Sequence, residues 1–143
     1  MKDMSKKIVV SACLMGRNCK YNGGNNYNEK LVAMLKDREI IEVCPEVAAG
    51  MPIPRPAVEI YHGRVIREDG SDWDDVYRKG VEVVLNQLKH EDIDYAVLQS
   101  RSPTCGVKQI YDGTFSKKRV DGQGILAKAL AERGIKLVDI EDI

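Results

Sequence analysis

The sequence lacks the features that mark nucleic-acid-binding, membrane and exported proteins. Its 22 Lys and Arg residues balance 22 Asp and Glu residues, so no overall positive field is present and a general DNA-binding role is disfavoured. No apolar run approaches the roughly 20 residues of a membrane span. The apolar stretch at 8–12, which follows a charged N-terminus, is short for a signal peptide. We therefore expect a cytoplasmic protein without a membrane or nucleic-acid partner.

The cysteines also lack a familiar spacing. Cys13, Cys19, Cys44 and Cys105 form no Cys-x-x-Cys pair, so the zinc-ribbon, thioredoxin and ferredoxin patterns are all absent. A reducing cytoplasm argues against two structural disulfides. Four unrelated buried thiols are the plain alternative to a shared site, since free cysteine is often buried.

What the sequence does contain is an alternation of strand and helix patterns. Its 143 residues suit one domain, 1–143. Apolar runs predict strands at 7–12, 40–44, 95–99 and 135–139, and apolar residues at steps of three and four predict helices at 29–37, from 71 or 72 to 88, and from about 125 to 133. We expect an α/β fold, Rossmann-like, with a mostly parallel sheet flanked by helices. A Pro-rich loop at 51–56 and a small hairpin at 58–67 interrupt this pattern.

Three of the four cysteines follow predicted strands. Cys13 comes just after the first strand, Cys44 closes the second, and Cys105 lies in the loop after the third. Because ligands of open parallel sheets bind outside the carboxyl ends of the strands, these thiols are expected to converge there. Converging thiols suit a soft metal centre, either zinc or an iron–sulfur cluster. Spacing alone does not choose between the two.

Five segments, in order, resemble motifs of the thiouracil desulfurase family, formerly domain of unknown function 523. They are VSACLMGRNCKYNG at 10–23, CPEV at 44–47, GMPIPRPAVE at 50–59, SRSPTCG at 100–106 and IYDGTF at 110–115. The resemblance runs from about Val9 to the last predicted strand. It departs at 72–74, where many members have Asp-Val-Thr and this chain has Asp-Trp-Asp.

The resemblance implies a [4Fe–4S] cluster held by only Cys13, Cys44 and Cys105. The fourth iron would then be open and would act as a Lewis acid with a preference for sulfur. It would polarise the carbon–sulfur bond of a small thiocarbonyl, such as a thiolated nucleobase, so that water replaces the sulfur without net redox change. The expected activity is therefore a non-redox desulfuration.

Three further residues are candidates for catalysis. Glu46, two residues past Cys44, is expected to act as acid or base, although it is also compatible with a plain loop carboxylate. Cys19 is either a fourth ligand or, as the resemblance favours, a free thiol beside the open iron. The Ser102 hydroxyl either contacts the substrate or cluster, or belongs to a Ser-Pro turn.

Two weaker candidates concern substrate binding. Ser100 resembles Ser102 in its position before Cys105. Arg55, held between two prolines, binds an anionic substrate group or pairs with Glu59 or Asp72, and the pairing is preferred. The runner-up function is a non-catalytic metal-binding module, which is either an electron-transfer cluster with Cys19 as fourth ligand or a structural zinc site.

Overall fold

A four-stranded parallel sheet forms the centre of the molecule. A computed structural model describes residues 6–143; the first residues of the N-terminal segment weighed above as a signal peptide lie outside this range. The strands are β1 (Lys7–Ser11), β2 (Ile40–Val43), β5 (Ile93–Leu98) and β8 (Lys136–Asp139), in the order β2-β1-β5-β8. All three neighbouring pairs are parallel. The predicted α/β fold class is confirmed.

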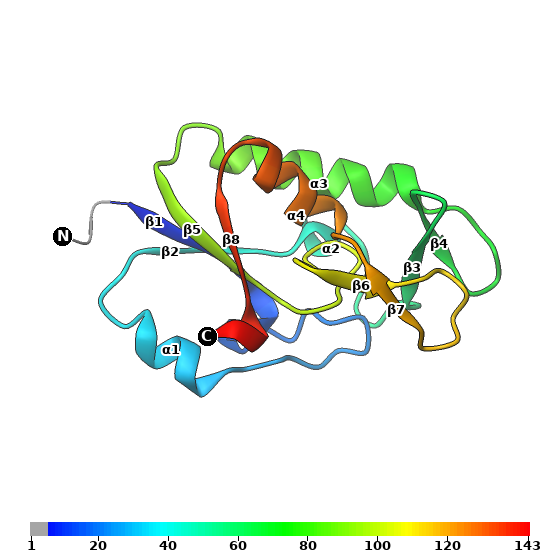
Figure 1. Cartoon of the computed structure of the whole chain (residues 1–143), viewed down its shortest axis with the longest axis horizontal. Helices are drawn as coiled ribbons and strands as arrows, with labels where there is room; N and C mark the ends of the chain where they lie inside the picture. Colours follow the sequence, from blue (N-terminus) through cyan, green and yellow to red (C-terminus); the bar gives the residue numbers. More distant parts are fainter. Residues whose placement is uncertain (1–5) are drawn as a thin grey trace.

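Helices cover both faces of this sheet (Figure 1). The side chains of a strand alternate between its faces. Val9 of β1 therefore packs in the same cluster as residues of α3 (Asp74–Leu88) and α4 (Ile125–Glu132), whereas Ile8 and Val10 pack with residues of α1 (Glu29–Met34). All three β1 side chains are fully buried. The near-continuous apolar composition of β1 follows from burial on both faces.

The order of the strands creates a crevice at the carboxyl edge of the sheet. The chain passes from β1 through α1 to β2 on one side, and then returns to β5 on the other side of β1. The loops that follow β1 and β5 therefore leave the sheet in opposite directions, as at the switch point where doubly wound folds bind their ligands. The cysteine-bearing loops leave from this same edge.

Two antiparallel hairpins stand beyond the carboxyl edge of the sheet (Figure 1). The first, β3 (Val58–Tyr61) with β4 (Arg64–Arg67), turns through His62 and Gly63, whose φ angles of 50° and 78° suit a tight two-residue link. The second pairs β6 (Gln109–Tyr111) with β7 (Arg119–Asp121). Apolar patterning does not reveal β7, because its three residues are all exposed. Residues 112–118 form the loop that joins the two strands.

Short helical turns were missed, and two helix boundaries were wrong. The chain also forms η1 (Ala12–Met15), α2 (Pro45–Ala48) and η2 (Ile140–Asp142). Pro45, which follows β2 and Cys44, is the first residue of α2, where the missing N–H costs nothing. Helix α1 is shorter than predicted. Helix α3 begins at Asp74 because the Asp72 carboxylate accepts the Asp74 N–H at 2.9 Å.

Among the described residues, no helix is both long and apolar enough to cross a bilayer.

Candidate functional site

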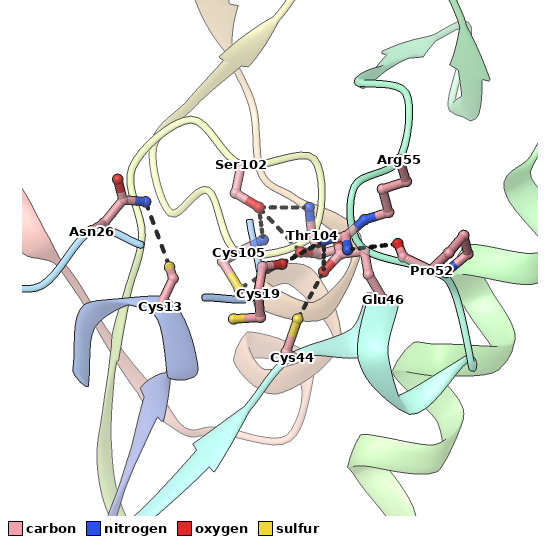
Figure 2. Close-up of polar contacts among 10 residues, drawn as sticks. All are labelled: Cys13, Cys19, Asn26, Cys44, Glu46, Pro52, Arg55, Ser102, Thr104 and Cys105. Carbon is pink, nitrogen blue, oxygen red and sulfur yellow. Dashed lines mark hydrogen bonds and ion pairs between the residues drawn. The ribbon is translucent and has the colours of Figure 1, made fainter. Parts of the chain in front are cut away.

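All four cysteines line one cavity of about 520 Å³ at the carboxyl edge of the sheet. Cys13 lies in η1, Cys44 immediately precedes α2, and Cys105 lies in the loop after β5. Cys19 lies in the loop that follows η1 and is buried. The thiols enter the site from three segments of the chain: Cys13 and Cys19 from the connection between β1 and α1, Cys44 from the end of β2, and Cys105 from the loop after β5 (Figure 2). The convergence expected from the strand ends is therefore observed, and Cys19 joins it.

The first cysteine is placed by the turn that ends η1. Gly16 adopts a φ of 95° there, a left-handed conformation that glycine tolerates best. The returning loop brings Asn26 back to Cys13: the Asn26 N–H donates to the Cys13 carbonyl at 2.9 Å, and Asn26 Nδ2 donates to Cys13 Sγ at 3.5 Å. Asn26 thus supplies a hydrogen bond to the sulfur, and a thiolate at this position would gain most from it.

The Cys105 loop is held from both sides by hydrogen bonds. Ser102 Oγ accepts the Cys105 N–H at 3.0 Å and the Thr104 N–H at 3.2 Å. The first N–H groups of α4, from Leu126 and Ala127, donate to the Thr104 carbonyl at 2.9 and 3.1 Å. The orphan donors at the start of α4 therefore secure the peptide that carries Cys105.

Close packing at Gly124 completes this contact. A Cβ added to Gly124 would lie 2.4 Å from the Thr104 carbonyl carbon and 2.8 Å from the Cys105 nitrogen. Since both atoms are backbone, neither can move without shifting the cysteine loop. Gly124 is thus needed for the close approach of α4 to this loop, and a side chain there would displace it.

We expect Gly124→Ala to lower the free energy of unfolding by about 1–3 kcal/mol, the usual range for overpacking a well-packed site. The same change should increase the reaction of Cys105 with a thiol reagent, because the loop is displaced. Gly122→Ala is the control, since its Cβ would meet only side-chain atoms of Ile110. Urea unfolding and mass-spectrometric mapping of the labelled thiols measure both effects. Equal stability of the two variants would contradict the packing argument.

A buried carboxylate stands beside the thiols. Glu46 of α2 is only 9% exposed. Its Oε1 accepts the Thr104 hydroxyl at 3.0 Å, and its Oε2 lies 3.3 Å from the Cys44 thiol that donates to it. Arg55 Nη2 lies 3.8 Å from the same Oε2. Glu46 is therefore part of the cavity wall and not a plain loop carboxylate on the surface.

The expected pairing of Arg55 with Glu59 or Asp72 is wrong. Arg55 is 8% exposed and points into the site, where its Nη2 donates to the Cys19 carbonyl at 2.7 Å. Glu59 accepts backbone N–H groups of the β6–β7 loop, and Asp72 pairs with Arg64. The error arose because chain proximity suggested partners, whereas the Pro-rich loop folds back over Cys19.

The guanidinium of Arg55 also lies beside a buried phenol. Its Nε has no hydrogen-bond partner among the described residues, although it is buried. The Tyr77 side chain of α3 lines the same cavity, and burial raises the pKa of Tyr77 to about 12. The Tyr77 phenol and the Arg55 guanidinium therefore both belong to the cavity wall that contains Glu46.

The thiols differ in how readily they lose a proton. Burial raises the pKa of Cys105 to about 12 and also raises that of Cys13. The neighbouring Cys19 thiol, and then burial, raise the Cys44 pKa, and the interaction with Cys44 lowers the Cys19 pKa to about 7. Thiolate ligation at Cys13, Cys44 and Cys105 thus needs the positive charge of a metal.

The donor types of the cavity suit a thiolate-bound metal centre. The four thiols lie around its walls. Within residues 6–143, no three His, Cys, Asp or Glu side chains lie close enough together to hold a single metal ion as they stand. Cysteine thiolates are ligands of both zinc and iron–sulfur clusters, so the donor set alone fits both kinds of centre.

A sequence profile of the 2-thiouracil desulfurase family matches residues 8–142. The chain belongs to this family. It is 30% identical over 146 residues to the uncharacterized protein YbbK of Bacillus subtilis (strain 168), covering 95% of this chain and 97% of YbbK. It is 33% identical to the [4Fe-4S]-dependent thiouracil desulfidase TudS, with a TM-score of 0.89, over 96% of this chain and 93% of TudS. The expected family and the expected enzyme class, a desulfidase, are confirmed.

Within this desulfurase, the two serine candidates differ. Ser102 lines the cavity. Its Oγ accepts the backbone N–H groups of Thr104 and Cys105 and lies 3.1 Å from Thr104 Oγ1. The turn role predicted for this hydroxyl is therefore observed. The Ser100 hydroxyl donates to buried Asp139 at 2.6 Å and thereby joins the loop after β5 to the end of β8. Ser100 also lines the cavity, and its contact with a substrate stays a prediction.

Sequence reasoning missed several residues of the desulfurase site. They are Asn26, Tyr77, Thr104, Tyr111 and Phe115, all of which line the cavity. Thr104 had a usable signal, since it immediately precedes Cys105. Tyr77 had none, because its helical spacing is that of a core residue and its hydroxyl enters the site only through the packing of α3 on α2.

Proposed function

We propose that this protein removes the sulfur atom from a thiolated nucleobase or a related small thiocarbonyl, using a [4Fe–4S] cluster bound by Cys13, Cys44 and Cys105. One observation carries the proposal: four thiols and a buried carboxylate line the same cavity at the carboxyl edge of the sheet. The activity and cofactor named for TudS, whose fold this chain shares, support it. The remaining thiol, Cys19, is proposed as a non-ligand beside the cluster.

A cluster held by three cysteines would supply an iron that binds the thiocarbonyl sulfur and withdraws electrons from the carbon. The chain would supply the proton transfers. As a ligand, Cys44 would carry no proton and would no longer donate to Glu46 Oε2. Oε2 would then be able to accept a proton from the water that attacks the carbon, and the sulfur would leave as hydrosulfide. Glu46 Oε2 is therefore the proposed base.

Two neighbours hold this carboxylate in place. The Thr104 hydroxyl fixes Oε1, and the Arg55 guanidinium balances the charge near Oε2. Arg55 also donates to the Cys19 and Pro52 carbonyls, which fix the guanidinium beside Glu46. Thr104 and Arg55 are positioning residues for Glu46.

Thr104→Val tests the positioning role. Valine keeps the shape of threonine but cannot donate to Oε1. We therefore expect kcat for 2-thiouracil to fall by about tenfold or more, with little change in KM. This loss is smaller than the 10²–10⁴-fold rate increase that a placed base contributes. Thr104→Ser should restore the rate, and iron content should stay the same in both. A loss of iron in Thr104→Val would instead assign the hydroxyl to cluster binding.

The activity itself is tested on protein purified and reconstituted without oxygen. About four irons and four sulfides per chain are expected, together with release of hydrosulfide and uracil from 2-thiouracil. Cluster formation without turnover of any thiocarbonyl would remove desulfuration and favour the electron-transfer alternative, for which Cys19 is placed in the same cavity.

A further inference from the structure

We propose that Phe115 is a specificity-determining residue, which stacks against the ring of the substrate and favours ring compounds over acyclic thiocarbonyls. This inference rests on the proposed desulfurase function and narrows its substrate class. Phe115 is the only phenylalanine of the chain. It lies in the β6–β7 loop, is half-buried, and lines the cavity that the four cysteines also line. An aromatic wall thus shares the cavity with the thiols.

The backbone at Phe115 is strained. Its φ is 56°, in the left-handed region that bulky residues rarely adopt. Such a conformation persists only where the surroundings hold it, and these residues gather at ligand-binding sites. Lys117, two residues further along the same loop, has a φ of 64°. The loop therefore departs from relaxed geometry at the residues that border the cavity.

The surroundings that hold Phe115 are visible. Glu59 of β3 extends its carboxylate into the loop, where Oε1 accepts the Gly113 N–H at 3.0 Å and the Phe115 N–H at 3.1 Å. Gly113 packs so closely on β3 that a Cβ there would lie 2.6 Å from the Ile60 carbonyl oxygen. The loop is therefore docked on the first hairpin and presents Phe115 as a fixed wall.

This wall suits a flat ring. An aromatic side chain stacks on the face of a base without needing particular substituents. Tyr111 of β6 lines the same cavity, so the hairpin contributes two aromatic residues while the cysteine loops contribute the thiols and the carboxylate. The volume of about 520 Å³ lies within the usual range for small-molecule sites. An acyclic thioamide would gain nothing from the stacking surface.

The test measures binding separately from turnover. Uracil binding to anaerobically reconstituted protein is measured by calorimetry for the wild type, Phe115→Leu and Phe115→Tyr. We expect Phe115→Leu to weaken the Kd by about tenfold, within the range found for the loss of one base–aromatic stack, and Phe115→Tyr to restore it. Val120→Ala, an exposed position in the same hairpin, is the matched control and should bind as the wild type does.

Turnover of 2-thiouracil and thioacetamide supplies the second arm. Phe115→Leu should raise KM for 2-thiouracil by a similar factor and leave the rate with thioacetamide unchanged. The inference is overturned if Phe115→Leu binds uracil as tightly as the wild type, or if the wild type desulfurates thioacetamide as efficiently as 2-thiouracil. If Phe115-dependent uracil binding is found but no thiocarbonyl releases sulfide, the desulfurase proposal fails and ring recognition stands.

One more variant keeps the inference testable if Phe115→Leu does not fold. Phe115→Trp keeps an aromatic face at the cavity wall and adds a second tryptophan to a chain that has one, Trp73. The additional emission should be quenched when uracil is added, with the same concentration dependence as in calorimetry. Emission that is insensitive to saturating uracil would show that the residue does not meet the ring and would overturn the inference.

Discussion

Cys44→Ser is expected to abolish incorporation of the iron–sulfur cluster, and Cys13→Ser and Cys105→Ser should do the same. Each substitution replaces a soft thiolate with a hydroxyl, a poor ligand for iron in such clusters. The three residues come from separate segments around one cavity. Only Cys13 has a second thiol, Cys19, in its own segment, so Cys44 and Cys105 have no local replacement. Iron and sulfide analysis with visible absorption after anaerobic reconstitution measures the outcome.

Cys19→Ser is the matched control for this series. Cys19 lines the same cavity as the three proposed ligands, yet we expect its serine variant to keep iron and sulfide at the wild-type level. Loss of the cluster in Cys19→Ser would make it a fourth ligand. That result would close the coordination of the cluster and favour the electron-transfer function over desulfuration.

Glu46→Gln is expected to leave the cluster intact and to lower turnover of 2-thiouracil by roughly 10²–10⁴-fold, the usual contribution of a placed acid or base. Glutamine is nearly isosteric with glutamate, so the contact with the Thr104 hydroxyl can persist. The substitution removes the proton acceptor at Oε2. Hydrosulfide and uracil release from reconstituted protein measures the rate, and iron content establishes that the cluster is unchanged.

Glu82→Gln provides the comparison for this charge change, since Glu82 is an exposed residue of α3. Its turnover should equal that of the wild type. Glu46 also forms an ion pair with Arg55 at 3.8 Å. Glu46→Gln removes this partner of the buried guanidinium, so thermal unfolding is recorded alongside. Wild-type turnover in a folded, cluster-loaded Glu46→Gln protein would return Glu46 to a purely structural role.

Much of the fold was predictable because its signals are local. The apolar strand at 7–11 and the helix at 74–88 each carry their own periodicity, and the carboxyl ends of parallel strands must share an edge. These two facts were enough to bring Cys13, Cys44 and Cys105 to one place. The missed strand β7 is three exposed residues, which have no apolar face for a pattern to reveal.

The polar part of the site was less predictable. Arg55 was expected to pair with a carboxylate nearby in the chain, yet it lies against Glu46 and the Cys19 carbonyl. The partner of a charged side chain depends on the path of the loops, and the Pro-rich loop 51–56 has no periodicity that reports its direction. Thr104 and Tyr77 joined the site for the same reason, through contacts between α2, α3 and the Cys105 loop.

The sequence by itself determined the α/β class, the family and the convergence of three cysteines at the carboxyl edge, because strand patterns and ordered motifs are written along the chain. Only the tertiary structure decided that Cys19 enters the same cavity, that Arg55 and Thr104 flank Glu46, and that Glu59 holds Phe115 at the cavity wall. These are contacts between loops far apart in the chain. Their geometry follows from the packing of the elements that carry them, which no local pattern encodes.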